Sequence, residues 1–282
     1  MTFITIILAW GLVQHWGSAT PVHNDDWFDR WCPWVGERVE QPLVAVALLV
    51  LCPSVGVALL ANVVQDALFG LLYLGIGVVV LLYAFGRGDF DALIAGYGSR
   101  RRRGDNEGAF LYASIEMGLD LDAADGNDFD ALHDQVKREV LYRGFERWFA
   151  VVFYFILLGV AGALLYRLLH LLTARDDSPE HGQIAETVID ALDWLPSRLL
   201  VFAFALTGNF TATMAPLSDS LQDIYQPTED LLSMGAEAAM SSVSEGEFEG
   251  EQGAIPIADL SGLLSRSAAA WIGVIAVLTI VI

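Results

Sequence analysis

The sequence contains little cysteine and few cations, and both shortages exclude classes of protein. Its 282 residues include only two cysteines, Cys32 and Cys52, so neither a disulfide framework nor a cysteine-rich metal site is supported. Fifteen lysine and arginine residues stand against 35 aspartate and glutamate residues, and the formal net charge is -20. Because phosphate contacts need clustered cations, this acidic balance argues against nucleic acid as a partner.

Motifs that mark common enzyme chemistry are also missing. The sequence has no GxxxxGK[ST] phosphate loop, no HExxH zinc motif and no GxSxG nucleophile elbow. None of the five histidines forms an i, i+4 pair with another. We therefore expect no metal and no other cofactor, and the sequence favours a protein that is not an enzyme.

Apolar residues, in contrast, are abundant and clustered. They make up 55% of the chain, and the mean hydropathy is +0.49. A helix crosses the hydrocarbon core of a bilayer with about 20 apolar residues. Four runs approach this length: 42–64, 68–85, 148–172 and 263–282. The sequence therefore predicts an all-α, polytopic helical membrane protein with about four transmembrane helices.

Shorter apolar stretches are expected to form additional helices. The N-terminal stretch 1–14 is too short for a full span, and we expect a tilted or partly inserted helix. The apolar run 197–208 follows "ALDWLPSRLL", which predicts a helix–break–helix junction at the membrane surface. There Asp193 would cap the second helix and Pro196 would lie in its first turn. This second helix is expected to be re-entrant or interfacial.

Basic residues predict the orientation of the chain. Nine of the fifteen lie in 87–147, so the positive-inside rule places this loop in the cytoplasm. Within it, Leu132, Val136 and Val140 recur at helical spacing and predict an amphipathic helix that runs into the span at Trp148. We expect five regions: an N-terminal membrane region 1–86, the cytoplasmic loop 87–147, a membrane region 148–210 with one span and a broken helix, an acidic flexible segment 211–262, and a C-terminal span 263–282.

The densest basic run is "GSRRRRG", with Arg100, Arg101, Arg102 and Arg103. These cations could attract anionic lipid of the inner leaflet. They could equally serve only as a topology determinant. Both interpretations rest on the same charges and stay open.

Charges at the edges of apolar runs are the remaining candidates for a binding site, because charge is costly there. One interpretation is a site for a small anion or a lipid headgroup. The other is structural, with helix-end ion pairs and arginines that extend to the interface. Arg167 is expected to extend in this way or to meet Asp193. The candidate residues are Arg143, Glu146, Arg147, Tyr166, Arg167, Asp193 and Arg198.

Three stretches resemble the AmpE family: "YRGFERWFAVVFYFILLGVAGALLYRLLHLL", "ALDWLPSRLLVFAFALTGNF" and the C-terminal "WIGVIAVLTIVI". The resemblance is strongest over 142–210. It implies a multi-pass regulatory signalling modulator of the bacterial inner membrane. It further implies a role in β-lactamase induction and cell-wall recycling together with the cytoplasmic amidase AmpD.

The sequence is also distantly similar to the CobD/CbiB membrane proteins of cobalamin biosynthesis, which form an amide bond. Their "YR" and "NWIPARL" correspond to Tyr166–Arg167 and to Asp193–Leu199. Their polar "ENTSDG" corresponds to "RGFERW" and is not retained. This second resemblance implies, as an alternative, a CobD/CbiB-like enzyme or a protein that binds an anionic ligand, on a shared fold that does not itself carry function.

Overall fold

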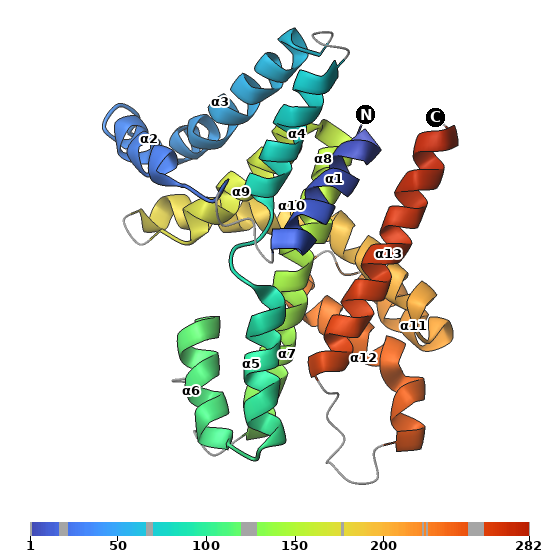
Figure 1. Ribbon diagram of the computed structural model, residues 1–282. Helices are drawn as coiled ribbons and strands as arrows, with labels where there is room; N and C mark the ends of the chain where they lie inside the picture. The colour runs from blue at the N-terminus through green and yellow to red at the C-terminus, as the bar shows by residue number, and fades with distance from the viewer. Residues whose placement is uncertain are drawn as a thin grey trace. The chain divides into compact units, whose positions relative to one another are not determined.

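The computed structural model describes residues 2–16, 22–65, 70–119, 129–175, 178–221, 223, 225–247 and 257–281. Within these ranges every regular element is a helix, so the predicted all-α class is confirmed (Figure 1). The chain divides into two compact units. Unit 1 comprises Met1–Gly88 and Glu146–Asp193, and unit 2 comprises Asp89–Phe145 and Trp194–Ile282.

Unit 1 is built around a central apolar helix, α9. This helix packs against α3, α4 and α8, while α1 packs on α4 and α2 packs on α3. The elements of this unit are α1 (Thr2–Trp16), α2 (Asp26–Gly36), α3 (Pro42–Val63), α4 (Leu71–Ala84), α8 (Val151–Leu158), α9 (Val160–Thr173) and the first part of α10 (Pro179–Thr207). A π-helix, η3 (Phe145–Ala150), begins at the boundary of the two units and leads into α8.

Unit 2 contains the predicted amphipathic helix, which is confirmed as α7 (Phe129–Gly144). Its residues Leu132, Val136 and Val140 are buried against Tyr97 and Met117, among others. The remaining helices of this unit are α5 (Phe90–Arg102), α6 (Asn106–Met117), α11 (Phe210–Ser220), α12 (Thr228–Glu247) and α13 (Ile257–Val281). The range 211–262 was expected to be flexible, but α11 and α12 occupy much of it, because each buries apolar residues such as Leu217 and Leu231.

Two helices are long and apolar enough to cross a membrane. They are Pro42–Val63 in α3 and Ile257–Thr279 in α13. Only 28% and 22% of their most apolar windows are buried. A soluble protein's core helix would hide these side chains, so such exposure fits a surface that faces lipid. These helices match the predicted spans 42–64 and 263–282.

The expectation of four long spans is wrong for the other two runs. The run 68–85 gives α4, whose 14 residues extend about 21 Å, short of a core about 30 Å thick. It is shortened because Gly70 before it is left-handed and Phe85 after it is extended. The run 148–172 is divided at Gly159, whose φ of 65° and ψ of -150° end α8 and begin α9.

The predicted break at "ALDWLPSRLL" is also wrong. The helix α10 continues from Pro179 to Thr207, with Pro196 inside it. Asp193 therefore does not cap a new helix. It is 1% exposed and its carboxylate accepts a hydrogen bond from the Tyr166 hydroxyl. Burial on both sides of the proline holds the helix together, since Ser197, Leu200 and Val201 are buried as well.

The dihedral angles of Gly159 lie in a region that only glycine occupies readily. Gly159→Ala should therefore lower the free energy of unfolding by about 1–3 kcal/mol. Gly56→Ala is the matched control, because Gly56 lies inside α3 with open space around it, and this change should be neutral or stabilising. Thermal unfolding in detergent measures both, and equal behaviour of the two variants would contradict the assignment.

Candidate functional site

The candidate site is a polar cluster within unit 1, formed by segments that are far apart in the sequence. The link before α2 contributes His23 and Asp25, and the end of α4 contributes Tyr83 with Arg87 just beyond it. The π-helix and α9 supply the remaining members: Glu146, Arg147, Arg167 and His170. The charged side chains are half-buried, with Arg87 and Asp25 27% and 29% exposed, so each loses part of its hydration and is stabilised by a partner.

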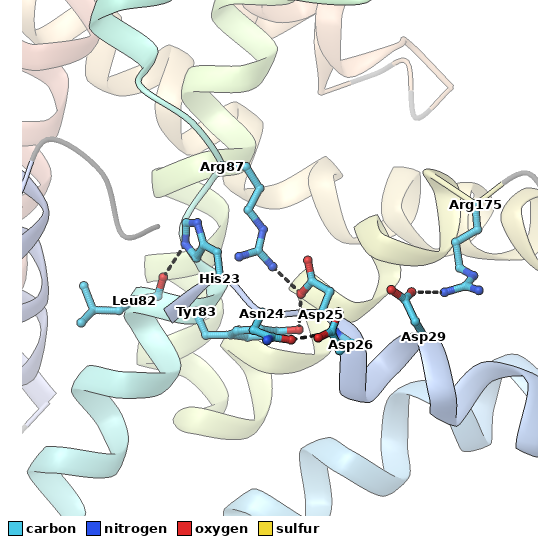
Figure 2. Close-up of polar contacts among 9 residues, drawn as sticks. All are labelled: His23, Asn24, Asp25, Asp26, Asp29, Leu82, Tyr83, Arg87 and Arg175. Atoms are coloured by element: carbon cyan, nitrogen blue, oxygen red, sulfur yellow. Dashed lines mark hydrogen bonds and ion pairs between the residues drawn. The ribbon is translucent and has the colours of Figure 1, made fainter. Parts of the chain in front are cut away.

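Asp25 organises the first half of the cluster. Its Oδ1 accepts hydrogen bonds from the Tyr83 hydroxyl at 2.6 Å and from Arg87 Nη2 at 2.5 Å (Figure 2). Its backbone carbonyl accepts from Phe28 and Asp29 at the first turn of α2. One residue therefore begins α2 and fixes this helix to the end of α4. Figure 2 also shows a separate ion pair between Asp29 and Arg175, 2.5 Å long.

His23 joins the same link to α4 by a second bond. Its Nε2–H donates to the carbonyl of Leu82 at 2.9 Å (Figure 2). Burial, reinforced by the positive charges of Arg87 and Arg167, lowers the pKa of His23 to about 4. The imidazole is therefore neutral near pH 7, and the cluster does not gain a positive charge from it.

Arg147 fixes the π-helix to the segment after α4. Its Nη1 and Nη2 donate to the carbonyls of Arg87 and Gly88 at 3.1 and 2.9 Å. Gly86 lies so close that an added Cβ would be 2.5 Å from Cγ of Arg147, so a side chain at this position would clash. Single-turn π segments are frequent at functional sites, and this one places Glu146 and Arg147 in the cluster.

Two further polar pairs each have one member on α9, His170 and Tyr166. Nδ1 of His170 lies 3.0 Å from the Glu146 carboxylate. The buried Tyr166 hydroxyl donates to Asp193 at 2.8 Å, and the Tyr166 ring stacks on that of Tyr154. Five of the seven predicted residues therefore belong to unit 1: Glu146, Arg147, Tyr166, Arg167 and Asp193.

Arg167 is different from the other cations of the cluster. Its Nε is enclosed, and among the described residues the side chain makes no hydrogen bond and no ion pair. The expected hydrogen bond or ion pair with Asp193 is not formed among the described residues, and the Asp193 carboxylate accepts a hydrogen bond from the neighbouring Tyr166. Arg167 does lie within electrostatic range of Arg87, Asp25 and Glu146.

The two other predicted residues belong to unit 2 and have structural partners. Arg143 donates to the Glu139 carboxylate and to the carbonyl of Met117. Arg198 is 4% exposed and donates to the carbonyls of Trp194, Ser220 and Asp223. Each guanidinium is therefore used to join segments within unit 2, a role that agrees with the structural interpretation of these charges.

Sequence reasoning missed His23, Asp25 and Tyr83 and treated Arg87 only as a topology signal. The contacts that unite them span 58 to 62 residues, and no local pattern marks them. The one available signal was the position of Arg87 directly after an apolar run. Within the described ranges, no group of three or more His, Cys, Asp or Glu side chains is placed to hold a metal ion.

The lowered pKa of His23 predicts a pH effect on stability. Between about pH 6.5 and 4 the unfolded state binds a proton at this residue and the folded state does not, so stability falls as pH falls through that window. His23→Gln removes the titration while keeping a donor for the Leu82 carbonyl. Unfolding temperatures at pH 7.5, 6 and 5 should fall less in the variant, and parallel profiles for the two proteins would contradict the assignment.

Comparison with known proteins gives one family. A family model described as "Regulatory signalling modulator protein AmpE" matches residues 1–281. No curated protein and no solved structure gives a significant match. The comparisons do not show the similarity to the CobD/CbiB proteins. Because the match covers nearly the whole chain, both units included, this chain belongs to the AmpE family of regulatory signalling modulators.

Proposed function

We propose that this chain is a multi-pass protein of the bacterial inner membrane that modulates β-lactamase induction and cell-wall recycling. In this proposal it acts with an AmpD-like cytoplasmic amidase. The observation that carries the proposal is the family match over residues 1–281. The two long apolar helices, α3 and α13, whose most apolar windows are mostly exposed, support a location in a membrane.

The segment 87–147 is the proposed cytoplasmic part, because it holds nine of the fifteen basic residues. Its described parts, 87–119 and 129–147, form the helices α5, α6 and α7 and the start of η3. The basic run forms the end of α5, where Arg100 donates to the carbonyl of Gly96 and lies over the Tyr112 ring of α6. Cations at a helix C-terminus also complement the helix dipole. The run thus has a local structural role besides its proposed effect on topology.

The proposed contact surface for the partner lies on α6. One face of this helix is buried in unit 2 through Ala109, Ala113 and Met117. On another face, Leu111 and Ile115 are 58% and 66% exposed, one helical turn apart. An exposed aliphatic pair on a cytoplasmic helix supports docking of a protein partner, since its burial would add to affinity.

Leu111→Ser combined with Ile115→Ser should lower recovery of an AmpD-like amidase co-purified from detergent at least tenfold. Both side chains are exposed, so the fold of unit 2 should be retained. Leu221→Ser is the matched control, because Leu221 is 56% exposed in the same unit but outside 87–147. Equal recovery with the double variant and the control would overturn the docking surface.

The topology has its own test. A reporter that works only in the cytoplasm should be active when it is fused after residue 115, because the cations of 87–147 favour the inner side of the membrane. An alkaline phosphatase fusion at the same position should be inactive, since that enzyme folds only outside the cytoplasm. The reverse pattern would contradict the proposed orientation and with it the contact to a cytoplasmic amidase.

A further inference from the structure

The feature that the proposed function leaves unused is Arg167 on α9. A guanidinium stays protonated in proteins, so its charge cannot be removed by titration. Arg167 is half-buried, and a charge that loses hydration without gaining a partner is costly. Yet within the described residues Arg167 has neither a carboxylate nor a carbonyl partner, and its Nε is buried. Such an arrangement is stable when a ligand supplies the missing acceptor.

A second guanidinium nearby also has an unused donor. Arg87 uses Nη2 for Asp25, but its Nη1 is buried without a partner in the described part of the chain. Figure 2 shows this other terminal nitrogen of Arg87 turned away from the Asp25 carboxylate. Arg87 and Arg167 are close enough for their charges to act on one another. Two like charges repel one another, and an anion shared by both guanidinium groups would offset that repulsion.

The carboxylates of the cluster already have partners within the chain. Arg87 and Arg167 act on one another, and the two carboxylates in range of Arg167 are Asp25 and Glu146. Both carboxylates are already engaged, Asp25 by Arg87 and Tyr83, and Glu146 by His170. Arg147 is held by the carbonyls of Arg87 and Gly88. The donors that stay unused are therefore those of Arg87 and Arg167.

We propose that Arg87 and Arg167 bind the phosphate group of an anionic ligand. Guanidinium donors match phosphate oxygens, which offer several acceptors to two forks at once. A phosphate group would offset the repulsion between the two guanidinium groups and would accept from their unused donors. The phosphate could come from a lipid headgroup or from a soluble phosphorylated metabolite. The proposal does not depend on the amidase partner and uses a different unit from the α6 surface.

The test uses the full-length protein, purified in detergent and stripped of lipid. Three probes are titrated: short-chain phosphatidylglycerol, glycerol 3-phosphate, and a diacylglycerol of the same chain length as a phosphate-free control. Binding is followed by calorimetry and by the shift in unfolding temperature. The wild-type protein should bind phosphatidylglycerol, glycerol 3-phosphate or both, and should not respond to diacylglycerol. Which phosphate binds identifies the source of the ligand.

Arg167→Gln should weaken phosphate binding at least tenfold and should not lower the unfolding temperature of the ligand-free protein. The second effect separates a binding role from a structural one, because Gln removes the uncompensated charge. Arg167→Lys should bind with intermediate affinity, since it keeps the charge but loses the fork. Arg175→Gln is the matched control, a cation of the same unit that already has a carboxylate partner in Asp29.

Arg87→Gln should also weaken binding, but it breaks the pair with Asp25 and should lower the unfolding temperature as well. Two results would overturn the proposal. The first is wild-type affinity for phosphate in Arg167→Gln. The second is a wild-type protein that binds neither phosphate probe, or that binds diacylglycerol as tightly as phosphatidylglycerol. Neither result would bear on the amidase contact.

Discussion

A charge among apolar helices needs a partner, and in unit 1 the carboxylate of Asp25 meets that need for two segments at once. It accepts from Tyr83 and Arg87, which follow it by 58 and 62 residues. Its backbone carbonyl begins α2. Removing this one group would leave a half-buried guanidinium and a buried phenol without this partner. The link before α2, the end of α4 and, through the carbonyls that Arg147 contacts, the π-helix all depend on this interaction.

The pattern of apolar residues in the sequence predicted correctly those helices that an apolar run or an apolar face is enough to define. The helices α3, α7 and α13 were placed correctly, because an apolar run or an apolar face needs no distant contact to be recognised. The prediction failed where the backbone conformation of one residue, or burial in the folded chain, determines whether a helix continues. Gly159 divides an apolar run by its dihedral angles, and Pro196 fails to break α10 because the flanking residues are buried.

The site shows the same division. Arg167 could be chosen as a candidate because a charge inside an apolar run is visible in the sequence. The residues around it could not be predicted. Asp25 and His23 lie in a short polar link, and their role is visible only from their contacts with the end of α4 and the residues after it. Asp193, the partner expected for Arg167, accepts a hydrogen bond from Tyr166, the residue before Arg167. Arg143 and Arg198 are also arginines, but both are used within unit 2. Arg143 donates to Glu139 and to the carbonyl of Met117, and Arg198 donates to the carbonyl of Ser220.

The central claim is that Arg87 and Arg167 share an anion that the chain itself does not supply. The most direct measurement is an experimental structure of the full-length protein soaked with tungstate, a phosphate analogue whose anomalous scattering marks its position. The account predicts an anomalous peak within hydrogen-bond distance of both guanidinium groups, and its loss in Arg167→Gln. A structure with no peak at this place, and with Arg167 paired to a carboxylate of the chain, would contradict it.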